Sequence, residues 1–235
     1  MSIRIETEHL MKLLGDLVHT AGGIGATSGV LLHTARGPLE DEPGTTDLLV
    51  GTSTDHFTVG HTYVECYGQL PDAMLWPLAD VRAVLGAYRP KAALTRNKSE
   101  KHTVVIGREA DVIVVREDPD LFNDGLTIRF SEGPISKYPT GLWRALTSAP
   151  PIADDWGPAE PRSDFYPDVL KPFLAVAKAR KEDLQVYRYH HRARYLVQIG
   201  NRYVGAAQPH NLWTTQNPGG GSAPAADVYA PALAD

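Results

Sequence analysis

One pattern occurs twice in this chain of 235 residues: an amphipathic helix followed by short segments of strand-like sequence. The first helix lies within 72–88 and the second at about 168–181, and three such segments follow each one. The links between these strands are too short for crossover helices, so the strands must pair mainly antiparallel. The repeat therefore predicts an α+β fold of duplicated domains, in which the second copy is the shorter.

The other segments agree with this fold class. Alternation predicts a strand at 2–6, and apolar residues at spacings of three and four predict a helix at about 8–20. Further strands are predicted at 29–33, 47–52, 57–67, 92–95, 103–106, 112–115, 126–130, 184–189, 195–199 and 203–206. We predict a short helix near 141–147 and a Pro-rich acidic loop at 149–164. These divide the chain into a first domain at 1–118, a shortened second domain at 119–212, and a flexible tail at 213–235.

Composition excludes several classes of protein. A single cysteine, Cys66, excludes a disulfide framework and any multi-cysteine metal site, and we expect it to be a small buried side chain. The chain has no run of 18 apolar residues, and its first ten residues lack the basic and apolar stretches of a signal peptide. We therefore expect a cytoplasmic protein with no membrane contact.

Catalytic motifs are missing from the sequence. It contains no phosphate-binding P-loop, no HExxH and no GxSxG pattern. The glycine-rich stretch at 22–29 follows a helix instead of a strand, which indicates a helix-ending turn and not a dinucleotide loop. His56 and His61 are expected on one strand with opposite orientations, so they do not indicate a metal site. We predict no enzyme, no cofactor and no metal; a small-molecule enzyme is the least favoured alternative.

Charge is distributed unevenly along the chain. The formal net charge is −5, which by itself disfavours DNA binding. Residues 171–202, however, contain eight Lys and Arg against two acidic residues, a balance of +6. Basic residues also accompany the first repeated helix. Cations on equivalent helices of two units predict contacts with nucleic-acid phosphates, although a basic helix face is more often only solvated.

A family resemblance follows from the segment at 165–209. Its ending, YLVQIGNRYVGAAQP, resembles the closing hairpin of a domain of the bacterial and phage DNA sliding clamps, after the helix and strand that precede it. MLWPLADVRAVLGAY at 74–88 is similar to the second helix of a clamp domain. ISKYPTGLW at 135–143 resembles the segment that opens a following domain. The resemblance touches most of residues 1–212, and the composition is typical of phage or actinobacterial proteins.

This resemblance implies a processivity factor for DNA replication. Clamp domains place sheets outside and helices inside, join edge to edge into a ring, and direct basic side chains at duplex DNA without base readout. It implies a homo-oligomeric ring and a partner that is a DNA polymerase or another replication protein, which docks near Tyr138, Pro139 and Pro209. The predicted DNA contacts are Lys12, Arg82, Arg89, Lys91, Lys171, Lys178 and Lys181.

Two departures from the clamp pattern leave an alternative open. A full second domain would have a long helix and about four strands before residue 165, where this chain has the Pro-rich loop. Ala206, Ala207 and Gln208 precede Pro209, where clamps have bulky apolar residues. The alternative is a clamp-derived interaction module that binds replication proteins without encircling DNA.

Overall fold

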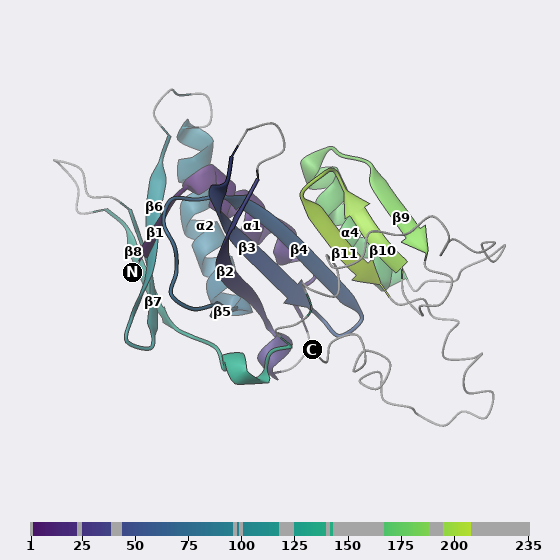
Figure 1. Ribbon diagram of the computed structural model, residues 1–235, viewed down its shortest axis with the longest axis horizontal. Coiled ribbons are helices and arrows are strands. Elements are labelled where there is room, and N and C mark those ends of the chain that lie inside the picture. The colour runs from purple at the N-terminus through teal and green to yellow at the C-terminus, as the bar shows by residue number, and fades with distance from the viewer. Residues whose placement is uncertain are drawn as a thin grey trace.

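The computed structural model describes residues 2–22, 25–38, 44–95, 98, 101–117, 125–139, 142, 167–188 and 195–207. Within these residues the chain forms two antiparallel sheets with helices packed on their inner faces (Figure 1). This is the predicted α+β fold with sheets outside and helices inside.

The first sheet has four strands. Their order is β1 (Ser2–Glu6), β6 (Thr103–Glu109), β7 (Val112–Glu117) and β8 (Thr127–Ser131), and all neighbours are antiparallel. Apolar and polar residues alternate because one face packs on the core and the other faces solvent. On the core face, Ile5, Val104 and Ile106 are fully buried.

The second sheet has seven strands and continues across both halves of the chain. Its order is β5 (Met74–Pro77), β2 (Gly29–Gly37), β3 (Thr46–Thr54), β4 (Thr58–Glu65), β11 (Tyr203–Ala207), β10 (Tyr195–Ile199) and β9 (Leu184–Arg188). The two halves join where β4 pairs with β11, with Gly60 opposite Gly205. Backbone hydrogen bonding therefore makes one sheet from two units.

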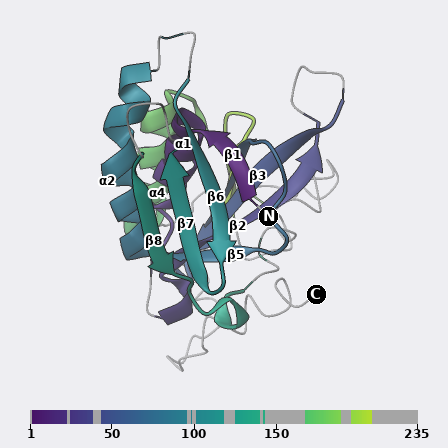
Figure 2. The ribbon, with the colours of Figure 1, turned by 90° about the vertical axis from the view of Figure 1, so that its left-hand side faces the viewer.

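Among the described residues, three helices cover the inner faces of the sheets: α1 (Thr7–Leu17), α2 (Leu78–Thr95) and α4 (Pro167–Arg180). The apolar stripe of α1 is fully buried at Leu10, Leu13, Leu14 and Leu17. In Figure 2, α2 and α4 lie on the same side of the molecule. None of the helices in the described part of the chain is long and apolar enough to span a membrane.

The second unit is small and has its own core. Phe173 and Val176 on α4 pack against Val197, Ile199 and Tyr203 on β10 and β11. Its elements run α4, β9, β10, β11, the same order as α2, β6, β7, β8 in the first unit. This is the predicted repeat, and the described second unit contains no counterpart of β1 to β5 or of α1.

Several predicted boundaries are wrong. Residues 74–77 form strand β5, because they pair with β2, and α2 begins only at Leu78. Residues 92–95 form the last turn of α2, which continues through Pro90, and not a strand. His56 lies in a turn with a φ of 78° between β3 and β4, and not on a strand.

The predicted domain boundary also differs from the sheet topology. Residues 126–130 were assigned to the second domain, but β8 pairs with β7 and completes the first sheet. A division after residue 118 therefore separates β8 from its sheet. Other predictions fall outside the described residues: most of the helix near 141–147, the loop at 149–164, Pro209 and the tail at 213–235.

Candidate nucleic-acid interface

Exposed cations on the three helices form the candidate interface. We call them the helix surface: Lys12 on α1, Arg82 and Arg89 on α2, Lys171 and Lys178 on α4, and Lys181 directly after α4. Of the acidic residues in these three helices, Asp168 is exposed, Glu8 and Asp80 are half-buried, and Asp16 is buried. The helix surface is therefore strongly positive within a chain of net charge −5.

Arg89 brings the charge of α2 close to α1. A Cβ atom at Gly15 of α1 would lie 3.8 Å from Arg89 Nη2, so the guanidinium lies beside the α1 backbone. Burial lowers the pKa of His19, Arg89 lowers it further, and Asp16 opposes both. The His19 imidazole is therefore neutral at neutral pH, and the positive charge here comes from Arg89 and Lys12.

The lysines of α4 are exposed because the opposite side of the helix is buried in the small core. Lys171 and Lys178 are seven residues apart, which is two helical turns, and they share one face. Lys181 follows the helix with a φ of 57°, and the N–H of Glu182 donates to the carbonyl of Ala177. This left-handed residue ends the helix and turns the chain toward β9.

A buried ion pair fixes α4 beside α1. Arg180 donates from Nε and Nη2 to Asp16 Oδ2 at 3.0 and 2.7 Å, and Nη2 also donates to Thr62 Oγ1 at 2.9 Å. The side chains of Asp16 and Arg180 are 4% and 3% exposed. Burial raises the pKa of Asp16, and Arg180 opposes this rise. The pair fixes the relative position of two helices that carry the helix surface.

Asp16 is an acidic residue on the buried side of α1. The residue lies three positions after Leu13 and one before Leu17, both fully buried, so its spacing places it at the edge of the apolar stripe. An acidic residue at such a position needs a buried partner. The sequence contains that signal, but not the identity of Arg180 as the partner.

Lys91 differs from the other predicted DNA contacts. Its ammonium forms an ion pair with Glu117 at the end of β7. Burial would raise the pKa of Glu117, but hydrogen bonds from Lys91 and from the Leu126 N–H outweigh this and lower it. Lys91 therefore stabilises the junction of α2 with the first sheet.

The same carboxylate completes a hydroxyl–imidazole–carboxylate series. Thr7 Oγ1 lies 2.7 Å from His102 Nδ1, and His102 Nε2 lies 3.2 Å from Glu117 Oε1. Activated nucleophiles have such a geometry, but Thr7 is fully buried, so no substrate reaches its hydroxyl. The series instead holds the start of α1 against β7. The described residues contain no group of three His, Cys, Asp or Glu side chains suited to a metal ion.

Tyr138, one of the predicted partner-docking residues, lies on the outer face of the second sheet. Tyr138 follows a short 3-10 helix, η2 (Ile135–Lys137), packs with Leu31 and Leu75, and donates from its hydroxyl to the Thr52 carbonyl at 3.0 Å. It is only 4% exposed. Tyr138 therefore holds the connecting segment on the sheet, while the neighbouring Pro139 is half-buried.

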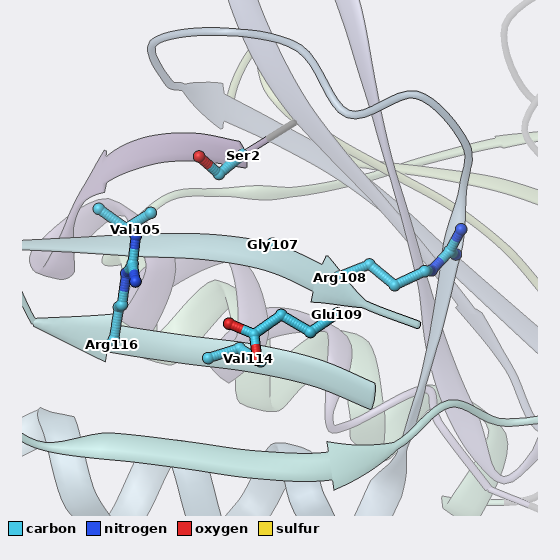
Figure 3. Close-up of a pocket in the computed structure, with 7 residues that line it drawn as sticks. All are labelled: Ser2, Val105, Gly107, Arg108, Glu109, Val114 and Arg116. Carbon is cyan, nitrogen blue, oxygen red and sulfur yellow. The ribbon is translucent and has the colours of Figure 1, made fainter. Parts of the chain in front are cut away.

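A small pocket on the first sheet was not anticipated. Its volume is about 190 Å³, and Figure 3 shows the residues that line it, among them Gly107, which pairs with Ser2 and Val114. Arg116 also lines the pocket. The pocket is on the outer face, away from the helices, so it is not part of the helix surface.

Comparisons with known proteins identify the fold. No family profile matches the sequence, and no curated protein matches it. The DNA polymerase III beta subunit of Thermotoga maritima superposes with a TM-score of 0.56 at 10% identity, covering 88% of this chain and 64% of that one. The beta subunit of Caulobacter crescentus gives 0.56 at 12% identity, with 89% and 65% covered. The sliding clamp of Bartonella birtlesii gives 0.57 at 10% identity, with 88% and 65% covered.

These likenesses extend over most of this chain and over about two thirds of each clamp. The chain spans 64% of the length of the Thermotoga protein. Identities of 10–12% with those structures establish the fold alone. The chain therefore has a sliding-clamp-like fold.

Proposed function

We propose that this chain is a clamp-like tether that holds a DNA polymerase or another replication protein on duplex DNA. The helix surface contacts backbone phosphates and reads no base, so the tether works on any sequence. The function is mechanical, and no bond is made or broken. Lys91 takes no part, because Glu117 holds its ammonium.

The observation that carries the proposal is the charge of the inner face. Five exposed cations and one exposed anion occupy three helices, whereas the chain as a whole has a net charge of −5. An acidic protein is repelled by DNA unless its cations gather on one side, where they displace the counterions of the phosphates. The likeness to DNA polymerase III beta subunits supports the same orientation of the helices toward DNA.

The test is the salt dependence of binding to a labelled duplex of random sequence, followed by fluorescence anisotropy. Each phosphate contact adds about 0.9 to the slope of log K against log salt. Replacing Lys171, Lys178 and Lys181 with Glu should abolish binding, and replacing all three with Gln should reduce the slope by about 3.

The matched control is Arg116→Glu, which reverses an exposed cation on the outer face of the first sheet. It should bind DNA as the native chain does. Equal binding by the triple Glu variant and the native chain would overturn the assignment of the helix surface. An equal loss in the Arg116→Glu control would do the same.

A second candidate function keeps the fold without the ring: an interaction module that binds a replication protein and does not encircle DNA. The small second unit favours it, because the described part of that unit lacks any equivalent of β4, the strand that joins the units here. Retention on nicked circular and linear duplexes at high salt separates the two. A closed ring stays on the circle after phosphate contacts are lost, whereas a module leaves both.

A further inference from the structure

The pocket on the outer face of the first sheet combines an apolar surface with charged side chains. Val105 on β6 and Val114 on β7 form its apolar part. Glu109 and Arg116 bring opposite charges to it, and Ser2 at the start of β1 adds a hydroxyl group (Figure 3). Binding sites typically have such a composition, an apolar lining with a few polar groups that orient the ligand. The charges of the lining residues indicate which ligand this pocket suits.

The acidic residue of the lining is already compensated. The carboxylate of Glu109 forms an ion pair with Arg129 on β8. Figure 3 shows this carboxylate beside Val114, which lies opposite Arg129 in the pairing of β7 with β8. Glu109 and Arg129 together are therefore a neutral part of the pocket, and they do not repel an anion.

Of the two arginines in the lining, one is compensated and the other is not. Arg108 donates from Nη2 to Glu132 Oε1 and to the Ala73 carbonyl, both at 2.8 Å, and Asp72 lies 3.7 Å from its Nη1. Arg116 is exposed and has no hydrogen bond or ion pair within the described part of the chain. The uncompensated charge of the lining side chains is therefore positive, and it belongs to Arg116.

The position and size of the pocket limit the ligand further. Arg116 lies opposite Val105 in the pairing of β6 with β7, and Figure 3 shows the two side chains next to each other. The cation thus borders the apolar surface directly. The volume of about 190 Å³ is below the range of about 300–1,000 Å³ that is usual for sites enclosing a small molecule. Because Ser2 and Arg116 are exposed, the pocket opens to solvent and suits one side chain of a larger partner.

We propose that this pocket binds a glutamate side chain of an acidic peptide segment in a partner protein. The carboxylate accepts hydrogen bonds from the Arg116 guanidinium and the Ser2 hydroxyl, and the methylene groups cover Val105 and Val114. A guanidinium can donate two parallel hydrogen bonds to one carboxylate, which favours glutamate over an uncharged side chain of the same shape. The inference does not depend on the proposed DNA binding, since the pocket lies on the outer face and the helix surface on the inner faces.

Titration of the ¹⁵N-labelled full chain with the peptide acetyl-Leu-Glu-Leu-amide, followed by NMR, tests the site. A single anchoring side chain gives weak binding, so we expect a dissociation constant of about 1 mM. The amide shifts should be largest around the pocket, at Gly107 and Val114. The matched peptide acetyl-Leu-Gln-Leu-amide has the same shape without the charge and should bind about tenfold more weakly. Equal binding of the two peptides, no binding of either, or shifts centred elsewhere would overturn the inference.

Variants of the chain separate this contact from a general attraction between peptide and protein. Arg116→Gln should weaken binding of the Glu peptide about tenfold, and Arg116→Lys, which keeps the charge, should restore part of it. Arg36→Gln is the matched control, because it removes an arginine that is 69% exposed and lies outside the pocket. It should bind the peptide as the native chain does. Unchanged binding by Arg116→Gln, or an equal loss in Arg36→Gln, would contradict the assignment, and the amide spectrum of each variant shows that it is folded.

Discussion

Asp16 of α1 and Arg180 of α4 form an ion pair that is almost completely buried, with Nη2 2.7 Å from Oδ2. Removing one member of such a pair leaves a buried charge without compensation, which costs about 3–5 kcal/mol. Arg180→Ala should therefore lower the free energy of unfolding by about that amount, measured by urea denaturation. Amide exchange should accelerate first in β10 and β11, because Arg180 joins their unit to α1.

The double variant Asp16→Leu with Arg180→Met is the control for this prediction. Replacing both charges with apolar side chains of similar volume should restore much of the lost stability, since no charge stays buried. If the double variant is as unstable as the single one, the loss in Arg180→Ala arises from packing and not from an unpaired charge.

His61 predicts a loss of stability in mild acid. Burial lowers its pKa from 6.5 to about 4, with a further contribution from His33, while Thr52 Oγ1 lies 2.9 Å from its Nδ1. The unfolded chain takes up this proton below pH 6.5 and the folded chain only near pH 4, so the folded state loses about 3 kcal/mol across that window. His61→Gln should flatten the decline in unfolding free energy between pH 7 and pH 4.5; an unchanged slope would contradict the prediction.

Gly205 leaves no room for a side chain at the junction of the two units. A Cβ atom there would lie 2.4 Å from Phe173 Cε1 and 2.8 Å from the Val59 carbonyl oxygen. Gly205→Ala should destabilise by about 1–3 kcal/mol through overpacking. Gly86 is exposed within α2 with nothing within 4 Å of such an atom, so Gly86→Ala should instead stabilise by about 0.5–1 kcal/mol. Thermal denaturation of the two variants should show shifts of opposite sign.

Lys181 adopts a left-handed conformation that favours glycine, with a φ of 57°. Lys181→Gly should raise the unfolding free energy by about 1 kcal/mol and also reduce the salt slope of DNA binding by about 0.9. Lys178→Gly, inside the helix, should give the same change in slope but lower stability by about 1 kcal/mol. A stability change of the same sign in both variants would contradict the role of Lys181 in ending α4.

Local periodicity was sufficient to predict most elements of the fold. The alternation in β1, the apolar stripe of α1 and the repeated helix-and-strand order all follow from spacing, because a half-buried element must present apolar residues at its own period. β5 was missed because a strand of four residues directly before a helix has too few positions to show alternation. The strand predicted at 92–95 is wrong because α2 continues through Pro90 and includes these residues in its last turn.

The helix surface was predicted only in part, and the reason is physical. Helical spacing shows which cations share a face, as for Lys171 and Lys178, but not what a long side chain reaches across space. Lys91 lies on α2 like the predicted DNA contacts Arg82 and Arg89, so the sequence gives no reason to treat it differently. Only the fold brings Glu117 next to its ammonium group. In the same way, the sequence indicates that the aromatic side chain of Tyr138 could contact a partner protein. In the folded chain, however, this side chain is buried on the sheet.

The amino-acid sequence alone thus determined the fold class, the repeat and the uneven charge of this protein, because each depends on residues close together in the chain. Only the tertiary structure decided the joining of β4 to β11, the burial of Asp16 with Arg180 and the ion pair of Lys91 with Glu117. Each of these depends on segments far apart in the sequence, whose contacts arise from the packing of whole elements.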